Sequence, residues 1–232
     1  MALTDARPKT SQADKPADSA APPVHQQTYS ALRERILFGG FEPGKPVTLR
    51  GLADDLDVSL MPVREAVRRL IAERALELHG NRRVSIPTMT GQRFREILLS
   101  RGLLEPELAL QALPRITDHD IDDLRQIDDH IDISMANGDT EGYMRGNYLF
   151  HSRLYAHSQS QVIHGLVDSL WLQFGPFMRL VYGRHGLTDL VDYHKEALQA
   201  LRLRDAMALR SAIAEDIRQG MHYIGDALSA DS

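Results

Sequence analysis

The sequence predicts a mainly helical chain of two domains, with one small β-hairpin in the first domain. Three observations carry this prediction. Short helical patterns followed by one alternating stretch fill residues 24–87, helical spacing of apolar residues dominates from residue 90 onward, and Pro87 to Thr90 separates the two patterns. With 43% apolar and 25% charged residues among 232, the chain has an ordinary globular composition.

Residues 1–23 carry almost no large apolar side chain, so ordering them would cost backbone entropy with no burial to offset it. We therefore expect a disordered tail over 1–23, a first domain over 24–87, a linker over 88–91 and a second domain over 92–232. The formal charge of −5 belongs to the second domain. Residues 25–90 contain ten Lys and Arg and eight Asp and Glu. Residues 91–232 contain fourteen Lys and Arg and twenty-one Asp and Glu.

The chain has no cysteine, which excludes disulfides, thiolate metal ligands and a cysteine nucleophile and is compatible with a reducing cytoplasm, the expected location. No apolar run reaches the roughly 18 residues that a spanning helix needs, and the N-terminus lacks a signal-peptide pattern. We expect no membrane partner. Any metal would be bound by nitrogen and oxygen ligands.

The first domain is expected to begin with a helix from about Thr28 to Leu37, which two glycines end. Thr48 is placed to cap a second helix and Ser59 a third, and the tight turn between these helices requires a steep crossing. In the third helix, apolar residues at i, i+3, i+4, i+7 and i+8 predict one buried face: Val63, Ala66, Val67, Leu70 and Ile71.

Arginines occupy the other faces of this third helix, at Arg64, Arg68 and Arg69. A helix that presents arginine opposite a buried face suits the major groove of DNA, where guanidinium groups pair with guanine. The alternative is a solvated basic face, which is what most charge runs are.

An alternating stretch from Leu76 to Ile86 follows, with a turn at Gly80-Asn81. It predicts a β-hairpin with Arg82 and Arg83 at its tip. Helix, turn, arginine-bearing helix and basic-tipped hairpin are typical of a winged helix-turn-helix, whose wing reaches phosphate or the minor groove. The pattern favours double-stranded DNA as a partner.

After residue 90 the periodicity predicts six helices with short connections, as in an antiparallel helical bundle. Their expected bounds are Gln92–Leu113, Thr117–Ala136, Thr140–His157, Gln161–Tyr182, Thr188–Arg204 and Asp205–Leu228. Thr117 and Thr140 are expected caps, and Gly175-Pro176 is expected to kink the fourth helix. The expected core includes Leu98, Ile127, Phe150, Leu154, Leu166, Leu170 and Leu198.

Four polar residues of the bundle are candidates for one site. Asn147 and His151 lie one turn apart on one helix face. The last two helices should be antiparallel about residues 204–205, and His194 lies ten residues before that turn and Asp216 eleven after it, so the two should lie side by side. A buried hydrogen-bonded network is the alternative to a binding site.

The first domain resembles the DNA-binding domain of the GntR family of bacterial transcription regulators. The matching segments are ILFGGFEPG at 36–44, LADDLDVS at 52–59 and PVREAVRRL at 62–70. The resemblance, with the arginine pattern, implies DNA contacts from the second and third helices and the wing: Arg50, Ser59, Arg64, Arg68, Asn81, Arg82 and Arg83. Leu60-Met61 departs from the family pattern, and Arg83 stands where glycine is usual, so an atypical operator and a differently bent wing are expected.

The second domain resembles the FCD effector domain of the FadR-type branch of this family. RGLLE at 101–105, the pair at 147 and 151, and HKEAL at 194–198 carry the resemblance. Many such domains bind a divalent metal with one Asp and three His, and the corresponding positions here read Asn147, His151, His194 and Asp216. This ligand set implies Zn, Ni, Mn or Fe, with His222 as a reserve ligand.

The same resemblance implies an effector site, with Arg101 binding the carboxylate of a small organic acid beside Asn147, His151 and His194. A structural salt bridge with Glu105, one turn away, is the alternative for Arg101.

The expected function is a homodimeric, DNA-binding transcription regulator, a repressor that its effector releases from DNA. A dimer reads a pseudo-palindrome with two winged helices. One alternative is an enzyme whose His/Asp metal site activates water, although no HExxH, G-x-S-x-G or phosphate-loop motif supports it. Another is a regulator for which the metal itself is the signal.

Overall fold

The computed structural model describes residues 22–80, 83–185 and 191–230. Over these residues the chain forms nine helices and one three-stranded sheet, which confirms the mainly helical fold class. Residues 1–21 of the expected tail, and Asn81 and Arg82 at the expected wing tip, lie outside the described residues.

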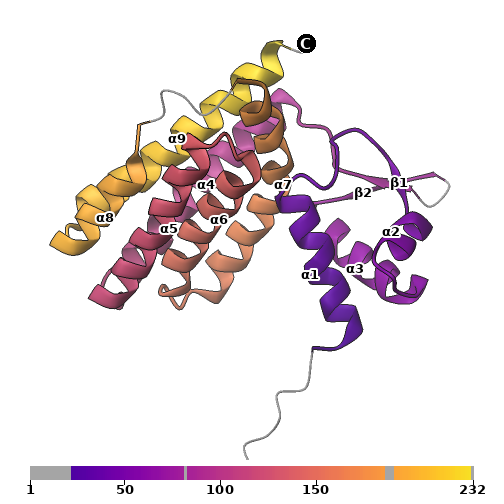
Figure 1. Ribbon diagram of the computed structural model, residues 1–232, viewed down its shortest axis with the longest axis horizontal. Helices are drawn as coiled ribbons and strands as arrows, with labels where there is room; N and C mark the ends of the chain where they lie inside the picture. Colours follow the sequence, from indigo (N-terminus) through magenta and orange to yellow (C-terminus); the bar gives the residue numbers. More distant parts are fainter. Residues whose placement is uncertain (1–21, 81–82, 186–190, 231–232) are drawn as a thin grey trace, which may run out of the picture.

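The N-terminal elements form one group: α1 Val24–Leu37, β1 Val47–Thr48, α2 Leu49–Asp55, α3 Leu60–Ala72, β2 Glu77–His79 and β3 Arg83–Ser85. The remaining helices form a bundle: α4 Gly91–Ala112, α5 Asp118–Ala136, α6 Thr140–Ala156, α7 Gln161–His185, α8 Tyr193–Leu203 and α9 Ala206–Ala230. Figure 1 shows the bundle helices packed side by side, with α1 as the N-terminal helix that lies against them.

The N-terminal group follows the predicted order of helices, with local differences at their starts. α1 begins before Thr28, because the carbonyl of Pro23 accepts hydrogen bonds from the backbone of the first turn. Thr48 caps α2 as predicted by accepting from the backbone N of Gly51 at 3.0 Å. Ser59 holds the N-cap position of α3 but makes no capping bond, so that part of the prediction is wrong.

The sheet has the order β1-β3-β2, with both pairings antiparallel. Val84 at its centre lies opposite Val47 of β1 and Leu78 of β2. The sequence did not predict β1, since two residues are too few to show an alternating pattern. Leu76 is buried as the alternation predicts, but Leu78, on the edge strand β2, is 62% exposed although its cross-strand partner Val84 is buried.

The bundle places α4 against α9, α5 against α6, and α8 against α9. Thr117 and Asp120 form a complete capping box at the start of α5, as expected of Thr117. The expected cap Thr140 is wrong. Asp139 caps α6 instead, because its carboxylate accepts from the backbone N of Gly142 at 2.9 Å.

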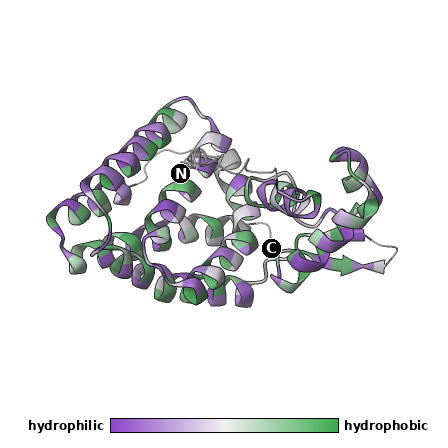
Figure 2. Cartoon of the chain, turned by 90° about the horizontal axis from the view of Figure 1, so that it is seen from below, coloured by the Kyte–Doolittle hydropathy of each residue, from purple (hydrophilic) through white to green (hydrophobic). Residues whose placement is uncertain are grey.

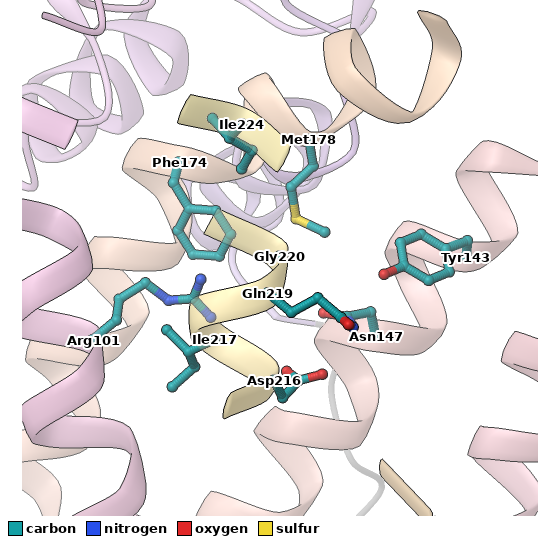
Figure 3. Close-up of a pocket in the computed structure, with 10 residues that line it drawn as sticks. All are labelled: Arg101, Tyr143, Asn147, Phe174, Met178, Asp216, Ile217, Gln219, Gly220 and Ile224. Carbon is teal, nitrogen blue, oxygen red and sulfur yellow. The ribbon is translucent and has the colours of Figure 1, made fainter. Parts of the chain in front are cut away.

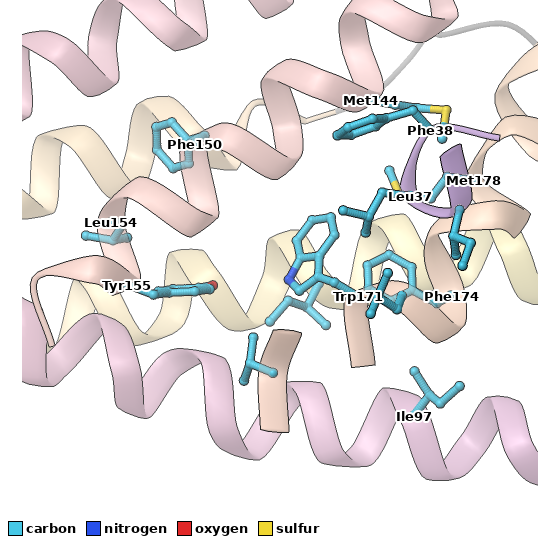
Figure 4. Packing of buried hydrophobic residues seen from close by; sticks show 14 of the residues in the cluster. Leu37, Phe38, Ile97, Met144, Phe150, Leu154, Tyr155, Trp171, Phe174 and Met178 are labelled. Atoms are coloured by element: carbon cyan, nitrogen blue, oxygen red, sulfur yellow. The ribbon is translucent and has the colours of Figure 1, made fainter. Parts of the chain in front are cut away.

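Most of the predicted core residues are buried or partly buried, and Leu166 is the exception at 53% exposed. Figure 2 shows hydrophobic and hydrophilic residues alternating along the helices, as amphipathic helices require. In Figure 4, Leu37 and Phe38 at the end of α1 lie beside Phe174 and Met178 of α7. The apolar core is therefore continuous between the N-terminal group and the bundle.

Candidate functional site

Three ligand-type side chains converge in the centre of the bundle, from α6, α8 and α9. His151 Nε2 lies 3.0 Å from Asp216 Oδ2, and His194 Nε2 lies 3.7 Å from Asp216 Oδ1. The two Nε2 atoms are 3.4 Å apart. His194 and Asp216 are thus side by side, as their spacing about the turn predicts. We call these three residues, with Asn147, the polar centre.

The other nitrogen of each imidazole has its own partner. His194 Nδ1 lies 3.2 Å from Asp128 Oδ1, and the ring stacks on Phe150 with centroids 4.1 Å apart. His151 Nδ1 lies 3.0 Å from the hydroxyl of Tyr155, which donates to Glu105 Oε2 at 3.0 Å. When each Nδ1–H donates to these oxygens, each Nε2 presents a lone pair to the polar centre.

Two lone pairs and a carboxylate at these distances repel one another unless a positive charge lies between them. Burial alone would raise the pKa of Asp216, but the charge of His194 and the hydrogen bond from His151 outweigh it and hold that pKa at about 2. Burial likewise works to lower the pKa of His194, yet the carboxylates of Asp216 and Asp128 raise it. The residues therefore fit a cation, which is either a proton or a metal ion.

Two cavities adjoin the polar centre, and Asn147 and Asp216 line both. One measures about 30 Å³ and lies between α4, α6, α7 and α9. In Figure 3, Arg101 reaches from α4 toward α9, and Asn147 and Tyr143 face the cavity from α6. The other measures about 130 Å³ and is bordered by Asp128 and His194.

Arg101 makes the salt bridge with Glu105 that the sequence left as an alternative. Its Nε donates to Glu105 Oε1 at 2.6 Å, and both side chains are buried. The guanidinium carbon lies 3.8 Å from the ring centroid of Phe174 and 4.8 Å from that of Trp171. Arg101 also lines the smaller cavity, so one guanidinium serves the ion pair and faces the polar centre.

The reserve ligand His222 is not near the polar centre. Its side chain is exposed, and it belongs to neither ligand group of the described residues, which are His151 with His194 and Asp216, and Asp128 with Asp192 and His194. Six residues beyond Asp216, a regular helix turns a side chain to another face.

Sequence reasoning missed Asp128 and Tyr155 as partners of the two histidines. A signal for Asp128 was present, because it interrupts a buried stripe formed by Ile121, Leu124 and Ile131. Tyr155 lies one turn after His151 on the same helix, but its link to Glu105 depends on how α4 packs against α6.

The expected DNA contacts within the described residues lie on the surface of the N-terminal group. Arg50, Ser59, Arg68 and Arg83 are exposed and Arg64 is half-buried. The neighbouring Arg69 differs, because its Nε lies 2.9 Å from Glu73 Oε1 and its guanidinium covers the ring of Tyr29 at 3.7 Å. Two of the three arginines of α3 therefore remain available for a partner, and Arg69 holds α3 to α1.

Within the described part of the chain, no helix combines the length and the apolar character that crossing a bilayer requires.

Two family models match the chain. The model for bacterial regulatory proteins of the gntR family matches residues 24–86, and the FCD domain model matches residues 96–219. These matches confirm the resemblance of both parts.

Curated relatives and solved structures agree with these matches. The chain is 25% identical to the HTH-type transcriptional regulator McbR of Escherichia coli K12 over 84% of this chain and 90% of McbR. It is 24% identical to the gluconate operon transcriptional repressor of Bacillus subtilis over 84% and 81% of the two chains. The E. coli McbR/YncC structure, 24% identical, superposes with a TM-score of 0.83 and covers 88% of this chain and 98% of that one. The relatives confirm a transcription regulator rather than an enzyme.

Proposed function

The chain belongs to the gntR family of bacterial regulatory proteins and carries an FCD domain, and from this premise we propose that it is a repressor that a small carboxylic acid releases from its operator. The observation that carries the proposal is the presence, in one chain, of an arginine-bearing α3 and a buried cluster of metal-ligand side chains in the bundle. The winged helix reads DNA, and the polar centre with Arg101 receives the acid.

Arg64 and Arg68 are proposed to contact bases or phosphates in the major groove. Replacing Arg64 by Ala should weaken binding to an operator selected from random-sequence DNA by about 1–3 kcal/mol. Fluorescence anisotropy at several salt concentrations measures this loss, because phosphate contacts make affinity fall with salt. Arg125→Ala, an exposed arginine of α5, is the matched control. Operator affinity that neither Arg64→Ala nor salt alters would contradict the proposal.

His151, His194 and Asp216 would hold a divalent cation, with the amide oxygen of Asn147 as a further ligand. A bound Zn, Ni, Mn or Fe ion would supply the positive charge that an acidic effector requires. After metal-replete purification, elemental analysis should find one metal per chain in the wild type and a loss in His151→Ala and His194→Ala. The exposed His130→Ala should retain the metal. Wild-type protein without metal would identify the polar centre as a buried hydrogen-bonded network.

The effector is proposed to be a small organic acid that binds Arg101. The cavities of about 30 and 130 Å³ are smaller than the 300–1,000 Å³ typical of ligand sites, so the acid must shift side chains or helices to enter. Such a shift gives binding a means to change DNA affinity. A screen of organic acids should find one that raises the melting temperature and releases the operator, and Arg101→Met should abolish both effects.

The small cavities also favour a second candidate, in which the metal itself is the signal. In that case metal alone releases the operator, and no acid in the screen adds to its effect. Operator titrations with metal, with acid and with both distinguish the two candidates.

We also propose that the chain acts as a homodimer through the exposed apolar side chains of α4 and α7. Leu99 and Leu103 on α4 are 64% and 59% exposed, and Val162 and Leu166 on the neighbouring α7 are 77% and 53% exposed. Exposed apolar patches mark interaction surfaces. Light scattering should find a dimer in the wild type and in Met207→Asp, an exposed apolar position elsewhere, and a monomer in Leu103→Asp. A dimer that survives Leu103→Asp would contradict this assignment.

A further inference from the structure

A larger cavity lies where the N-terminal group meets the bundle. It measures about 400 Å³, within the range of ligand sites, and shares no lining residue with the cavities beside the polar centre. The end of α3 contributes Arg74, and the segment before α4 contributes Thr88 and Thr90. The remaining lining residues come from α4 and α7: Gln92, Arg93, Glu96, Ile97, Ser100, Leu170 and Gln173. A ligand here would touch both parts of the molecule.

Arg93 is an incompletely compensated cation in this cavity. Its Nη2 donates to the carbonyl of Arg74 and to Gln173 Oε1, each at 2.9 Å, so no carboxylate partner is among its hydrogen bonds to described residues. Its Nε is buried and has no hydrogen-bond partner there. Burial lowers the pKa of Arg93, and the charge of Arg74 lowers it further against the opposing effect of Glu77 and Glu96.

Arg74 holds a backbone conformation that arginine adopts only at a cost. Its φ is 58°, in the left-handed region, where a residue with a Cβ is less stable than glycine. The position follows the C-terminus of α3, where glycine is the usual residue. Arg74 nevertheless lines the cavity, and its charge acts on Arg93. A costly conformation of this kind is often found at ligand sites.

The rest of the lining suits an anion with a small carbon skeleton. Glu96 is the acidic lining residue, and its Oε1 accepts from Gln92 Nε2 at 2.9 Å. Among the lining residues two arginines stand against one glutamate, and Glu77, which also acts on Arg93, lies outside the lining. Hydroxyl and amide groups surround these charges, and Ile97 and Leu170 supply apolar surface. The positive end of the α4 dipole adds to the attraction for an anion, because the helix begins at Gly91 beside the cavity.

We propose that this cavity binds a small metabolite through a carboxylate or phosphate group held between Arg74 and Arg93. The bound anion fixes the end of α3 to α4 and α7 and thereby sets the placement of the DNA-binding group on the bundle. The site is a second input to the regulator, separate from the polar centre.

Citrate and inorganic phosphate are the two probes, tested by isothermal titration calorimetry of the full chain at constant ionic strength. At least one of them should bind the wild type, and the one that binds identifies the oxyanion source. Arg74→Gly should weaken that binding about ten- to a hundredfold, the loss of one charge-assisted contact. Because glycine favours the left-handed conformation, this variant should fold at least as stably as the wild type. Arg93→Gln should weaken binding similarly, and the exposed Arg95→Gln should not.

A variant of the polar centre, Arg101→Met, separates this site from the one proposed above. Citrate or phosphate binding should persist in Arg101→Met and be lost in Arg74→Gly. Three outcomes would overturn the proposal: neither anion binds the wild type, Arg74→Gly binds as tightly as the wild type, or binding is lost in Arg101→Met alone.

Discussion

At the residue scale, Asp128 controls how His194 presents its ring. The carboxylate is buried and lies 3.2 Å from His194 Nδ1, so it holds the tautomer whose Nε2 faces the polar centre. We expect Asp128→Asn to weaken zinc binding about ten- to a hundredfold, since partners of ligating histidines have effects of this size. Competition with a zinc chelator measures the affinity. Asp129→Asn, an exposed neighbour, should bind zinc as the wild type does; equal loss in both variants would argue against this role.

Tyr155 joins His151 to Glu105, and its hydroxyl is buried. In Tyr155→Phe the hydroxyl is lost, and His151 Nδ1 and Glu105 each lose a partner in a place that water does not reach. Such losses cost about 1–3 kcal/mol each, so the free energy of unfolding should fall by at least that amount. Urea denaturation measures it. Tyr193→Phe, at a half-buried position, should change stability little, and a Tyr155→Phe protein as stable as the wild type would contradict the link.

The polar centre was predictable where it depends on local geometry. The i, i+4 pair on α6 and the symmetrical spacing of His194 and Asp216 about a tight turn follow from helix geometry alone. The contacts of Asp128 with His194 and of Glu105 with Tyr155 were not predictable, because the packing of helices distant in sequence sets them.

At the element scale, the two helix starts at α5 and α6 form a natural comparison. Thr117 caps α5 within a capping box, whereas Thr140 is the first residue of α6 and Asp139 is its cap. Thr117→Ala should lower the free energy of unfolding by about 1 kcal/mol, and Thr140→Ala should leave it nearly unchanged. Urea denaturation of both variants checks the pair. Equal effects would contradict the cap assignment.

The capping box also predicts a dependence on pH. Hydrogen bonds from the side chain and backbone of Thr117 lower the pKa of Asp120. When folding lowers the pKa of a carboxyl group, the charged group stabilises the protein at pH values above its pKa in the unfolded chain. This stabilisation is lost as the pH falls through the lowered pKa of the folded state. The stability difference between wild type and Asp120→Asn should therefore shrink below about pH 4. A difference that is constant from pH 7 to pH 3 would show that the carboxylate charge contributes nothing.

The helices were predictable because their apolar spacing repeats over several turns. Two features were not predicted. β1 has two residues and exists through its pairing with β3. Leu166 fits an apolar stripe but faces outward, next to Val162 on the same helix. This exposed stripe belongs to the surface proposed above for dimerisation.

At the scale of the whole molecule, the N-terminal group is fastened to the bundle through α1. Arg33 Nη2 donates to the hydroxyl of Tyr148 at 2.9 Å and to Asp168 at 3.0 Å. α7 passes so close to the end of α1 that a Cβ at Gly175 would lie 3.0 Å from the carbonyl oxygen of Leu37. No sequence pattern predicted this contact, because its partners lie more than a hundred residues apart.

Aromatic contacts connect this fastening to the polar centre. The ring of His151 lies 5.6 Å from that of Trp171, and Trp171 lies 5.3 Å from Tyr148, which holds Arg33. A rearrangement at His151 can therefore reach α1 through packed side chains. Arg33, which joins Tyr148 to α1, is the residue at which this coupling can be tested.

We expect Arg33→Met to uncouple the two parts. Metal binding at the polar centre should proceed as in the wild type. The fluorescence of Trp171, the only tryptophan, measures this binding, because its ring lies beside that of His151. The effect on operator affinity of the ligand that acts at the polar centre, whether acid or metal, should shrink, because Arg33 no longer ties α1 to Tyr148 and Asp168. Couplings of this kind are typically about 1–3 kcal/mol. Arg153→Met, an exposed arginine that pairs within the bundle, is the control and should keep the full effect. If Arg33→Met keeps the full response of operator affinity to that ligand, the signal reaches α3 by another route, and the junction around Arg74 and Arg93 is the next candidate.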